Sequence, residues 1–189
     1  MALDGFIKNI AFFGSAEVGK NNKYYKQAYN IAQILAKNDY RIINGGGPGI
    51  MDASTQGAES VGGNTLAVTF SPKDAPGFEG RYLKNRVDKE IKTNNYIERM
   101  FGLLENADCF IIFKGGTGTL SEFTTSWLLA HIYYPNYKPV ILFGKFWQNI
   151  INNLKKNMMI REESLKVFKI IEREDEVIPT IKKFEEDIK

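Results

Sequence analysis

The sequence predicts an α/β fold, in which helices cover both faces of a doubly wound parallel sheet. Short apolar segments rich in β-branched and aromatic residues alternate along the chain with longer segments of helical periodicity. The apolar segments lack a polar–apolar alternation, which is typical of strands buried on both faces of a parallel sheet. Two glycine-rich segments each follow a predicted strand and open a predicted helix, as the βα turns of such sheets do.

Strands and helices alternate through the first half of the chain. The segment 24–38 places Ala28, Ile31, Ala32 and Leu35 on one helical face. The next helix ends at Gly62-Gly63, because glycine commonly follows the last helical residue. The expected elements are a strand at 9–13, a helix at 24–38, a strand at 40–43, a helix at 50–60 and a strand at 64–70.

The second half begins with residues 71–84, whose two prolines and two glycines predict an irregular loop. The alternation then resumes. The expected elements are a helix at 88–105, a strand at 107–113, a helix with Leu120, Phe123, Trp127 and Ala130 on one face, a strand at 139–143, a helix at 146–156, an edge strand at 168–171 and a last amphipathic helix marked by Val177, Ile181, Phe184 and Ile188. Because the sequence contains no recognisable internal repeat or linker, residues 1–189 are expected to form a single domain.

The composition excludes several classes of function. The single cysteine, Cys109, cannot form an intrachain disulfide and is expected to be an inert core thiol, and the single histidine, His131, cannot complete a His₂ or His₃ metal site. A Ser-His-Asp triad would depend on His131 alone. The net charge of +3 is too small and dispersed for a nucleic-acid surface, and no apolar stretch approaches the roughly 18 residues of a membrane span. We therefore expect a cytoplasmic protein without nucleic-acid or membrane partners.

The two glycine-rich loops, Gly45–Gly49 and Lys114–Thr119, predict an anion site. Both lie at the carboxyl ends of predicted strands, where N–H groups at helix N-termini point toward a bound anion. One such loop alone could be only a tight turn, but two on one sheet edge favour a nucleotide or a sugar phosphate. Gly47–Asp52 lacks the third glycine of the dinucleotide fingerprint, and the strand ending at Phe70 lacks its acidic residue, which argues against a nicotinamide cofactor.

The first βα turn nearly matches a different phosphate-binding motif. Residues 14–20 fit the pattern G-x-x-x-x-G-K, but Asn21 stands where a Ser or Thr would hold magnesium. Glu17 would also project negative charge toward the phosphates. We interpret this match as coincidence.

Glu122 follows the second glycine loop and is expected in the first turn of its helix. A carboxylate there can simply complement the helix dipole. With a phosphate on the N–H groups of the same loop, Glu122 would instead lie near the sugar, where it could stabilise positive charge at an anomeric carbon or activate water.

Four segments, taken in order and spacing, carry a family resemblance. They are Phe13-Gly14-Ser15-Ala16, the segment from Gly45 to Ala53 (GGGPGIMDA), Glu98-Arg99, and the segment from Gly115 to Glu122 (GGTGTLSE). From about residue 9 to 171 the chain resembles the LOG family of cytokinin riboside 5′-monophosphate phosphoribohydrolases, which are often mislabelled lysine decarboxylases.

The resemblance implies a Rossmann-like homodimer that hydrolyses the N-glycosidic bond of a nucleoside 5′-monophosphate, either AMP or a cytokinin riboside 5′-monophosphate, without metal or cofactor. It implies Arg99 and Glu122 as the catalytic pair, with Arg99 holding phosphate or anchoring Glu122. It implies substrate and phosphate binding by Ser15, Gly46, Gly47, Gly115, Gly116, Thr117, Gly118 and Thr119.

Two departures from the family pattern concern substrate preference. Lys114 replaces the usual proline and could supply charge or point to solvent, and Met100 replaces the usual lysine and is expected in the core. The alternative function is a nucleotide or molybdenum-cofactor carrier of the same fold. Lysine decarboxylation would need a pyridoxal phosphate lysine, which no segment singles out.

Overall fold

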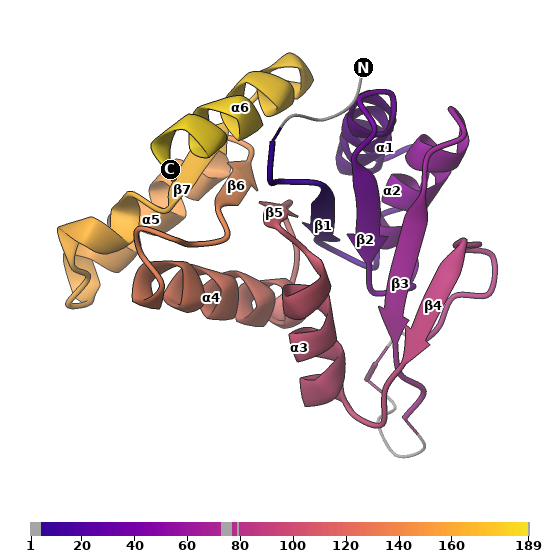
Figure 1. Ribbon diagram of the computed structural model, residues 1–189. Helices are drawn as coiled ribbons and strands as arrows, with labels where there is room; N and C mark the ends of the chain where they lie inside the picture. Colours follow the sequence, from indigo (N-terminus) through magenta and orange to yellow (C-terminus); the bar gives the residue numbers. More distant parts are fainter. Residues whose placement is uncertain (1–4, 73–76, 79, 189) are drawn as a thin grey trace.

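The computed structural model describes residues 5–72, 77–78 and 80–188, and within them a seven-stranded, all-parallel sheet lies between helices (Figure 1). The strand order is β4-β3-β2-β1-β5-β6-β7. This confirms the predicted Rossmann-like, doubly wound α/β fold.

Strands and helices alternate along the chain as predicted, except that β3 is followed directly by a further strand, β4. They are β1 (Asn9–Phe13), α1 (Lys23–Ala36), β2 (Arg41–Asn44), α2 (Ile50–Glu59), β3 (Thr65–Thr69), β4 (Lys89–Lys92), α3 (Tyr96–Asn106), β5 (Cys109–Ile112), α4 (Thr117–Ile132), β6 (Val140–Phe143), α5 (Phe146–Asn157), β7 (Phe168–Ile171) and α6 (Val177–Asp187), with short 3₁₀ helices at Glu162–Leu165 and Glu174–Glu176.

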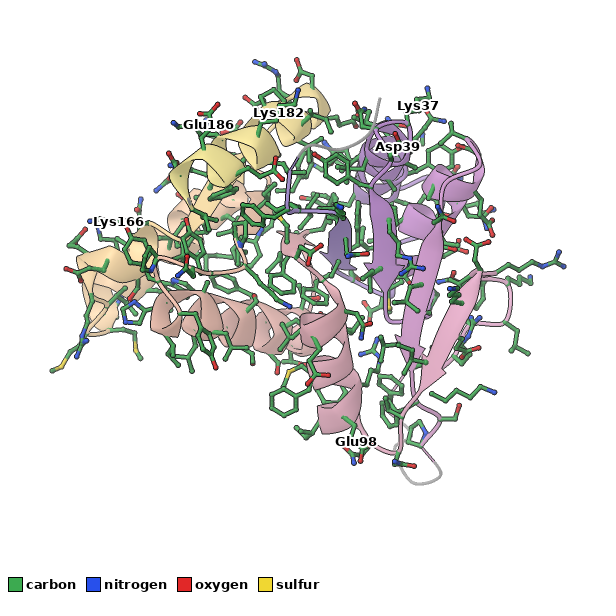
Figure 2. The ribbon with its side chains drawn as sticks, viewed as in Figure 1. Lys37, Asp39, Glu98, Lys166, Lys182 and Glu186 are labelled. Atoms are coloured by element: carbon green, nitrogen blue, oxygen red, sulfur yellow. The ribbon has the colours of Figure 1, made fainter. Side chains whose placement is uncertain are left out.

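The core lies along the central strands. β3, β5 and β6 are buried over their whole length, and β1 is buried after its first residue. Rings of neighbouring strands pack on one another, with Phe12 stacked 5.7 Å from Phe113 and Phe113 5.1 Å from Phe143. Each fully buried Phe or Ile side chain contributes about 1.5–3 kcal/mol. Charged side chains, among them Lys37, Lys166 and Glu186, project from the surface (Figure 2).

The sheet changes direction at β1. The chain winds from β1 through β2 and β3 to β4, then returns across the sheet to β5 and continues through β6 to β7. Because such crossovers are right-handed, α1 and α2 cover one face and α3 and α4 the other (Figure 1). The turns after β1 and β5 therefore diverge, and a crevice opens between the carboxyl ends of these strands, the usual ligand site of such folds.

The helix predicted at 88–105 is wrong in its first part. Lys89–Lys92 form the edge strand β4, which pairs with β3 from Leu66–Lys89 to Thr69–Lys92, and α3 begins only at Tyr96. All four residues of β4 are exposed, so it lacks the apolar pattern that identifies a buried strand. Its conformation depends on a partner strand about 23 residues earlier.

Other expectations can be checked directly. The described parts of 71–84 are irregular as predicted; Lys73–Pro76 and Glu79 lie outside the described residues. Cys109 is fully buried, and burial raises the pKa of its thiol, as expected of an inert core cysteine. In the part of the chain that the structure covers, no helix combines the length and apolar character needed to cross a membrane.

Candidate active site

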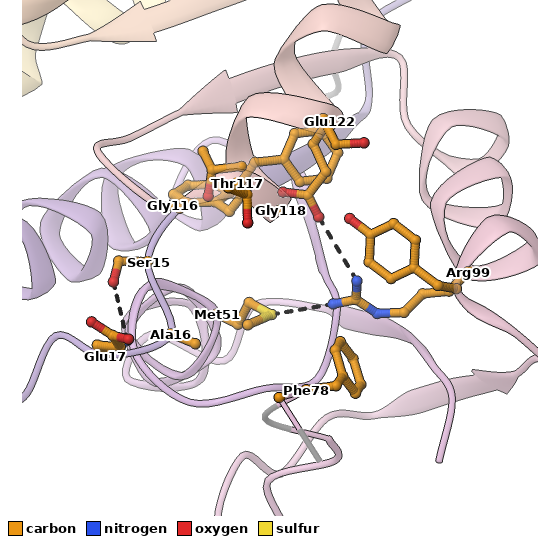
Figure 3. A pocket seen from close by; sticks show the side chains of 17 residues that line it. Ser15, Ala16, Glu17, Met51, Phe78, Arg99, Gly116, Thr117, Gly118 and Glu122 are labelled. Atoms are coloured by element: carbon orange, nitrogen blue, oxygen red, sulfur yellow. Dashed lines mark hydrogen bonds and ion pairs between the residues drawn. The ribbon is translucent and has the colours of Figure 1, made fainter. Parts of the chain in front are cut away.

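A pocket of about 660 Å³ opens at the carboxyl ends of β1 and β5 (Figure 3). Its walls come from the β1–α1 turn, the first turns of α4, the start of α2, and α3 with the loop before β4. The lining residues are Phe12, Phe13, Gly14, Ser15, Ala16, Glu17, Met51, Gly77, Phe78, Tyr96, Arg99, Gly116, Thr117, Gly118, Thr119, Ser121 and Glu122.

The N-terminus of α4 forms one wall of this pocket. The helix begins at Thr117, and its first backbone bond runs from Leu120 N to Gly116 O at 3.0 Å. The amides of Thr117, Gly118 and Thr119 therefore have no acceptor within the helix, and the helix dipole adds a partial positive charge there. This wall is suited to an anion such as a phosphate.

Backbone contacts hold the glycine loops together beside this helix end. Ser15 N donates to Lys114 O at 3.1 Å, and Ser15 O accepts from Ile50 N at 3.0 Å. At Gly115 a Cβ atom would overlap the Thr119 hydroxyl and lie 2.9 Å from Ser15 N. Gly115 thus permits the close approach of the β1–α1 turn to the loop before α4, although it does not itself line the pocket.

Arg99 and Glu122 face each other across the pocket. Their side chains come from α3 and α4, and Arg99 Nη1 lies 3.8 Å from Glu122 Oε1. Arg99 is 2% exposed and Glu122 8% exposed. The two side chains are therefore largely withdrawn from water, and removing one partner would leave the other buried without compensation.

The Arg99 guanidinium is surrounded on several sides. Nη2 lies 3.3 Å from Gly45 O and 3.6 Å from Met51 Sδ, while the rings of Phe78 and Tyr96 lie 5.5 and 6.0 Å from the guanidinium carbon. Within the described residues, the buried Nε has no hydrogen-bond partner. A buried cationic donor of this kind favours a ligand or water oxygen as its acceptor.

The local sequence explains why Arg99 points inward. Asn95 caps α3 by accepting a hydrogen bond from Glu98 N at 2.9 Å, which fixes where the helix begins. Glu98 then lies at the surface of the molecule (Figure 2), and the next residue, Arg99, turns toward the sheet. At Gly45 a Cβ atom would overlap Arg99 Nη2, so glycine there leaves room for the guanidinium.

Glu122 lies one turn later in its helix than the sequence predicts. Because Thr117–Thr119 are already helical, Glu122 belongs to the second turn of α4 rather than the first. The dipole explanation for its presence is thereby weakened, since that effect falls off within the first turn. Helical side chains lean toward the N-terminus, so the carboxylate still approaches the free amides.

The structure brings most of the predicted site residues into one pocket. Ser15, Gly116–Thr119, Arg99 and Glu122 all line it. Gly46 and Gly47 lie outside the lining. Gly46 N donates to Asn44 Oδ1 at 2.8 Å, while the carbonyls of Gly46 and Gly47 accept from Tyr82 N and Asn85 Nδ2. These two glycines anchor the segment after β3 instead.

Several lining residues were not identified from the sequence. Met51 lies in the glycine-rich segment from Gly45 to Ala53, but that motif does not indicate a contact with Arg99. Phe78 and Tyr96 are aromatic residues near a Gly/Pro-rich loop, and no motif identifies them as part of a site. Only the fold places them against Arg99, because they come from α2, the loop before β4 and α3.

The two departures from the family pattern have clear positions. Met100 is buried, as expected, and its Sδ accepts contacts from the Ser121 and Thr125 hydroxyls at 3.7 Å. Lys114 is exposed and does not line the pocket; its Nζ lies 5.8 Å from the ring of Phe146 and 6.0 Å from that of Tyr24.

Lys20, the lysine of the near-match to the P-loop, also lies outside the lining of the pocket. Among the described residues, no group of three or more His, Cys, Asp or Glu side chains is suited to a metal ion.

The chain is similar in sequence to proteins of an archaeon and a plant. An uncharacterized protein of Archaeoglobus fulgidus is 30% identical over 116 residues, which cover 61% of this chain and 71% of that protein. The cytokinin riboside 5′-monophosphate phosphoribohydrolase LOG5 of Arabidopsis thaliana is 29% identical over 119 residues, covering 61% of this chain and 49% of LOG5.

Solved structures show the same fold. The molybdenum cofactor binding protein of Rippkaea orientalis superposes with a TM-score of 0.68 at 23% identity, covering 94% of this chain and 96% of the other. At that identity the likeness concerns the fold. The family model of SLOG cluster4 matches residues 7–170, which span the glycine loops, Arg99 and Glu122. The chain therefore belongs to the LOG-like SLOG cluster4 family.

Proposed function

We propose that this protein hydrolyses the N-glycosidic bond of a nucleoside 5′-monophosphate, releasing the free base and ribose 5-phosphate. The observation that carries the proposal is the buried Arg99–Glu122 pair, which lies in one pocket with the free N-terminal amides of α4. The name of LOG5, a relative at 29% identity, supports the same reaction class. AMP and cytokinin riboside 5′-monophosphates are the candidate substrates.

The arrangement suits each part of such a substrate. The 5′-phosphate would accept hydrogen bonds from the amides of Thr117, Gly118 and Thr119. The ribose would then lie beside Glu122, whose carboxylate stabilises the positive charge that develops on the sugar as the C1′–N bond breaks. Water adds to C1′ and gives one proton to Glu122, while the bonding electron pair leaves with the base. The base takes up one proton from solvent, and Glu122 returns its proton to solvent, so that the carboxylate is regenerated.

Arg99 has two roles in this proposal. Its Nη1 faces the Glu122 carboxylate and orients it. Its Nε, which has no partner among the described residues, can donate to an oxygen of the substrate. The sequence leaves open whether Arg99 holds phosphate or anchors Glu122. In this proposal Nη1 anchors Glu122, and Nε is available to an oxygen of the substrate.

Base release tests the proposal. AMP, other nucleoside 5′-monophosphates and the matched nucleosides are incubated with the purified protein, and free base is quantified by chromatography. We expect release from monophosphates and little from nucleosides, and loss of release in Glu122→Ala with unchanged circular dichroism. The control Glu163→Gln alters an exposed carboxylate outside the pocket and should keep full activity.

Two results would contradict the proposal. Unchanged turnover in Glu122→Ala would remove Glu122 from the mechanism. No base release from any monophosphate, together with a nucleotide or molybdenum cofactor retained through purification and detected by mass spectrometry, would favour a carrier. The fold shared with the Rippkaea protein makes the carrier the appropriate alternative to test.

A further inference from the structure

The pocket has two ends with opposite chemistry. Arg99, Tyr96 and Phe78 form one end, and the β1–α1 turn with Ser15 and Glu17 forms the other, while the first turns of α4 lie between them (Figure 3). Among the described residues that line the pocket, Arg99 has the only positively charged side chain, and Glu17 and Glu122 have negatively charged ones. The described lining thus brings no cationic side chain to the end where Glu17 lies.

The proposed function, on which this inference rests, fixes how a nucleotide would lie. The ribose must reach Glu122, and the phosphate must reach the amides at the start of α4. From Thr117 to Glu122 the helix rises about 7.5 Å, and the Glu122 side chain leans back toward the N-terminus, which leaves a gap suited to a sugar phosphate. The phosphate oxygens farthest from the ribose would then face the turn formed by Ser15 and Glu17.

Local hydrogen bonds fix the backbone at this turn. Glu17 N donates to the Ser15 hydroxyl at 3.1 Å, and Ser15 is held by its backbone bonds to Lys114 and Ile50. The exposed Glu17 side chain lines the pocket together with Gly116–Thr119 at the start of α4. A second phosphate attached to the first would extend toward this carboxylate, and like charges a few ångströms apart repel.

We infer that Glu17 is a specificity-determining residue that restricts the phosphate end of the pocket to monoesters. Amides of α4 compensate the charge of one phosphate group. A 5′-diphosphate would bring one or two further negative charges against Glu17, with no lysine or arginine of the described lining to neutralise them. In P-loops, by contrast, a lysine reaches the outer phosphates, and the corresponding Lys20 lies outside this pocket.

Calorimetry with AMP and ADP tests this inference separately from catalysis. The dissociation constants are measured in the Glu122→Ala background, with and without Glu17→Gln. We expect Glu17→Gln to improve ADP binding relative to AMP binding about three- to tenfold, the size expected for one unit charge several ångströms away near a protein surface. Glu17→Asp should retain the preference for AMP, and Glu163→Gln, which changes net charge equally outside the pocket, should leave the ratio unchanged.

Salt provides a second readout, because screening weakens the repulsion. For each protein, the dissociation constant of ADP is divided by that of AMP. The difference in this ratio between the proteins with and without Glu17→Gln should shrink as the salt concentration rises from about 50 mM to 500 mM. The inference would be overturned if Glu17→Gln left the ratio of the ADP and AMP dissociation constants unchanged. It would also be overturned if Glu163→Gln changed that ratio as much as Glu17→Gln does. Failure of AMP to bind would overturn it too. Absence of base release from AMP by the unmodified protein, with the binding ratio shifted as expected, would reject only the hydrolase.

Discussion

Arg99 is buried, charged and in contact with several different elements of the fold. Its guanidinium group pairs with Glu122 and lies beside the Gly45 carbonyl and the Met51 sulfur. The aromatic rings of Phe78 and Tyr96 lie near the same group. Guanidinium groups tolerate such surroundings because they are planar, permanently charged and less strongly hydrated than an ammonium group. The position of this one side chain therefore depends on neighbours most of which have no charge of their own.

Gly45→Ala should displace Arg99, because the added methyl group would overlap Nη2. We expect base release to fall about a hundredfold, the effect of misplacing a catalytic group by about 1 Å. The control is Gly19→Ala, where a Cβ atom would meet nothing within 4 Å. Equal activity of the two variants, measured as kcat/KM with AMP, would show that Gly45 does not position Arg99.

Among the elements, β4 and the segment before it show how the pocket is supported from a distance. Arg81 Nη1 donates to Gly46 O at 3.1 Å, and its Nε lies 3.1 Å from Glu90 Oε1 on β4. Glu90 also accepts from the Thr69 hydroxyl on β3 at 2.6 Å. The exposed edge strand is thereby connected to the glycine loop beside Arg99.

Stability at acid pH tests this connection. The Thr69 hydroxyl bond, followed by Arg81, lowers the pKa of Glu90 below its ordinary value of 4.5. A carboxyl with a lowered folded pKa stabilises the protein above the ordinary pKa and loses that contribution as pH falls through the folded pKa. Glu90→Gln should therefore have a lower Tm than the unmodified protein at pH 7, and the difference should vanish well below pH 4.5.

Thermal unfolding monitored by circular dichroism between neutral and acid pH provides the measurement. Because Glu90 is partly exposed, we expect a shift of only a few degrees. The control is Glu163→Gln. Within the part of the chain that the structure describes, the exposed Glu163 side chain has no contacts like those of Glu90 with Thr69 and Arg81. A Tm difference that stays constant with pH would mean that ionisation of Glu90 does not contribute.

At the scale of the whole molecule, α4 is apolar on both sides. Phe123, Trp127 and Ala130 face the core, and the Trp127 indole donates to Ser164 O, so Trp127 belongs to the core. The opposite side exposes Leu128 and Ile132, and α3 exposes Ile97 and Phe101. Leu120 is also exposed, at the start of α4, although its spacing predicts the core-facing side. Helices that are apolar all round are usually covered, and the family resemblance implies a homodimer.

We expect a second copy of the chain to cover this face. The protein should sediment as a dimer in analytical ultracentrifugation, and Leu128→Glu together with Ile132→Glu should yield monomers, because both side chains are more than half exposed. Asn149→Glu, on an exposed position of α5, serves as the control and should remain dimeric. Monomeric behaviour of the unmodified protein at micromolar concentration would contradict the prediction.

The amino-acid sequence alone was enough to predict the alternation of elements, the buried strands and the two glycine loops at one sheet edge. These features are local, since periodicity and turn residues act over a few positions. The family motifs also selected Arg99 and Glu122, which the structure places 3.8 Å apart. Their hydrolytic role and the phosphate role of the glycine loops remain predictions.

Which residues meet in space became clear only from the folded chain. β4 forms because β3 provides hydrogen-bond partners, although its own residues resemble an exposed helix. The carbonyls of Gly46 and Gly47 accept hydrogen bonds from Tyr82 and Asn85 of the segment after β3, which lies far from them in the sequence. Met51, Phe78 and Tyr96 surround Arg99 for the same reason: contacts between distant segments depend on packing, which no local pattern encodes.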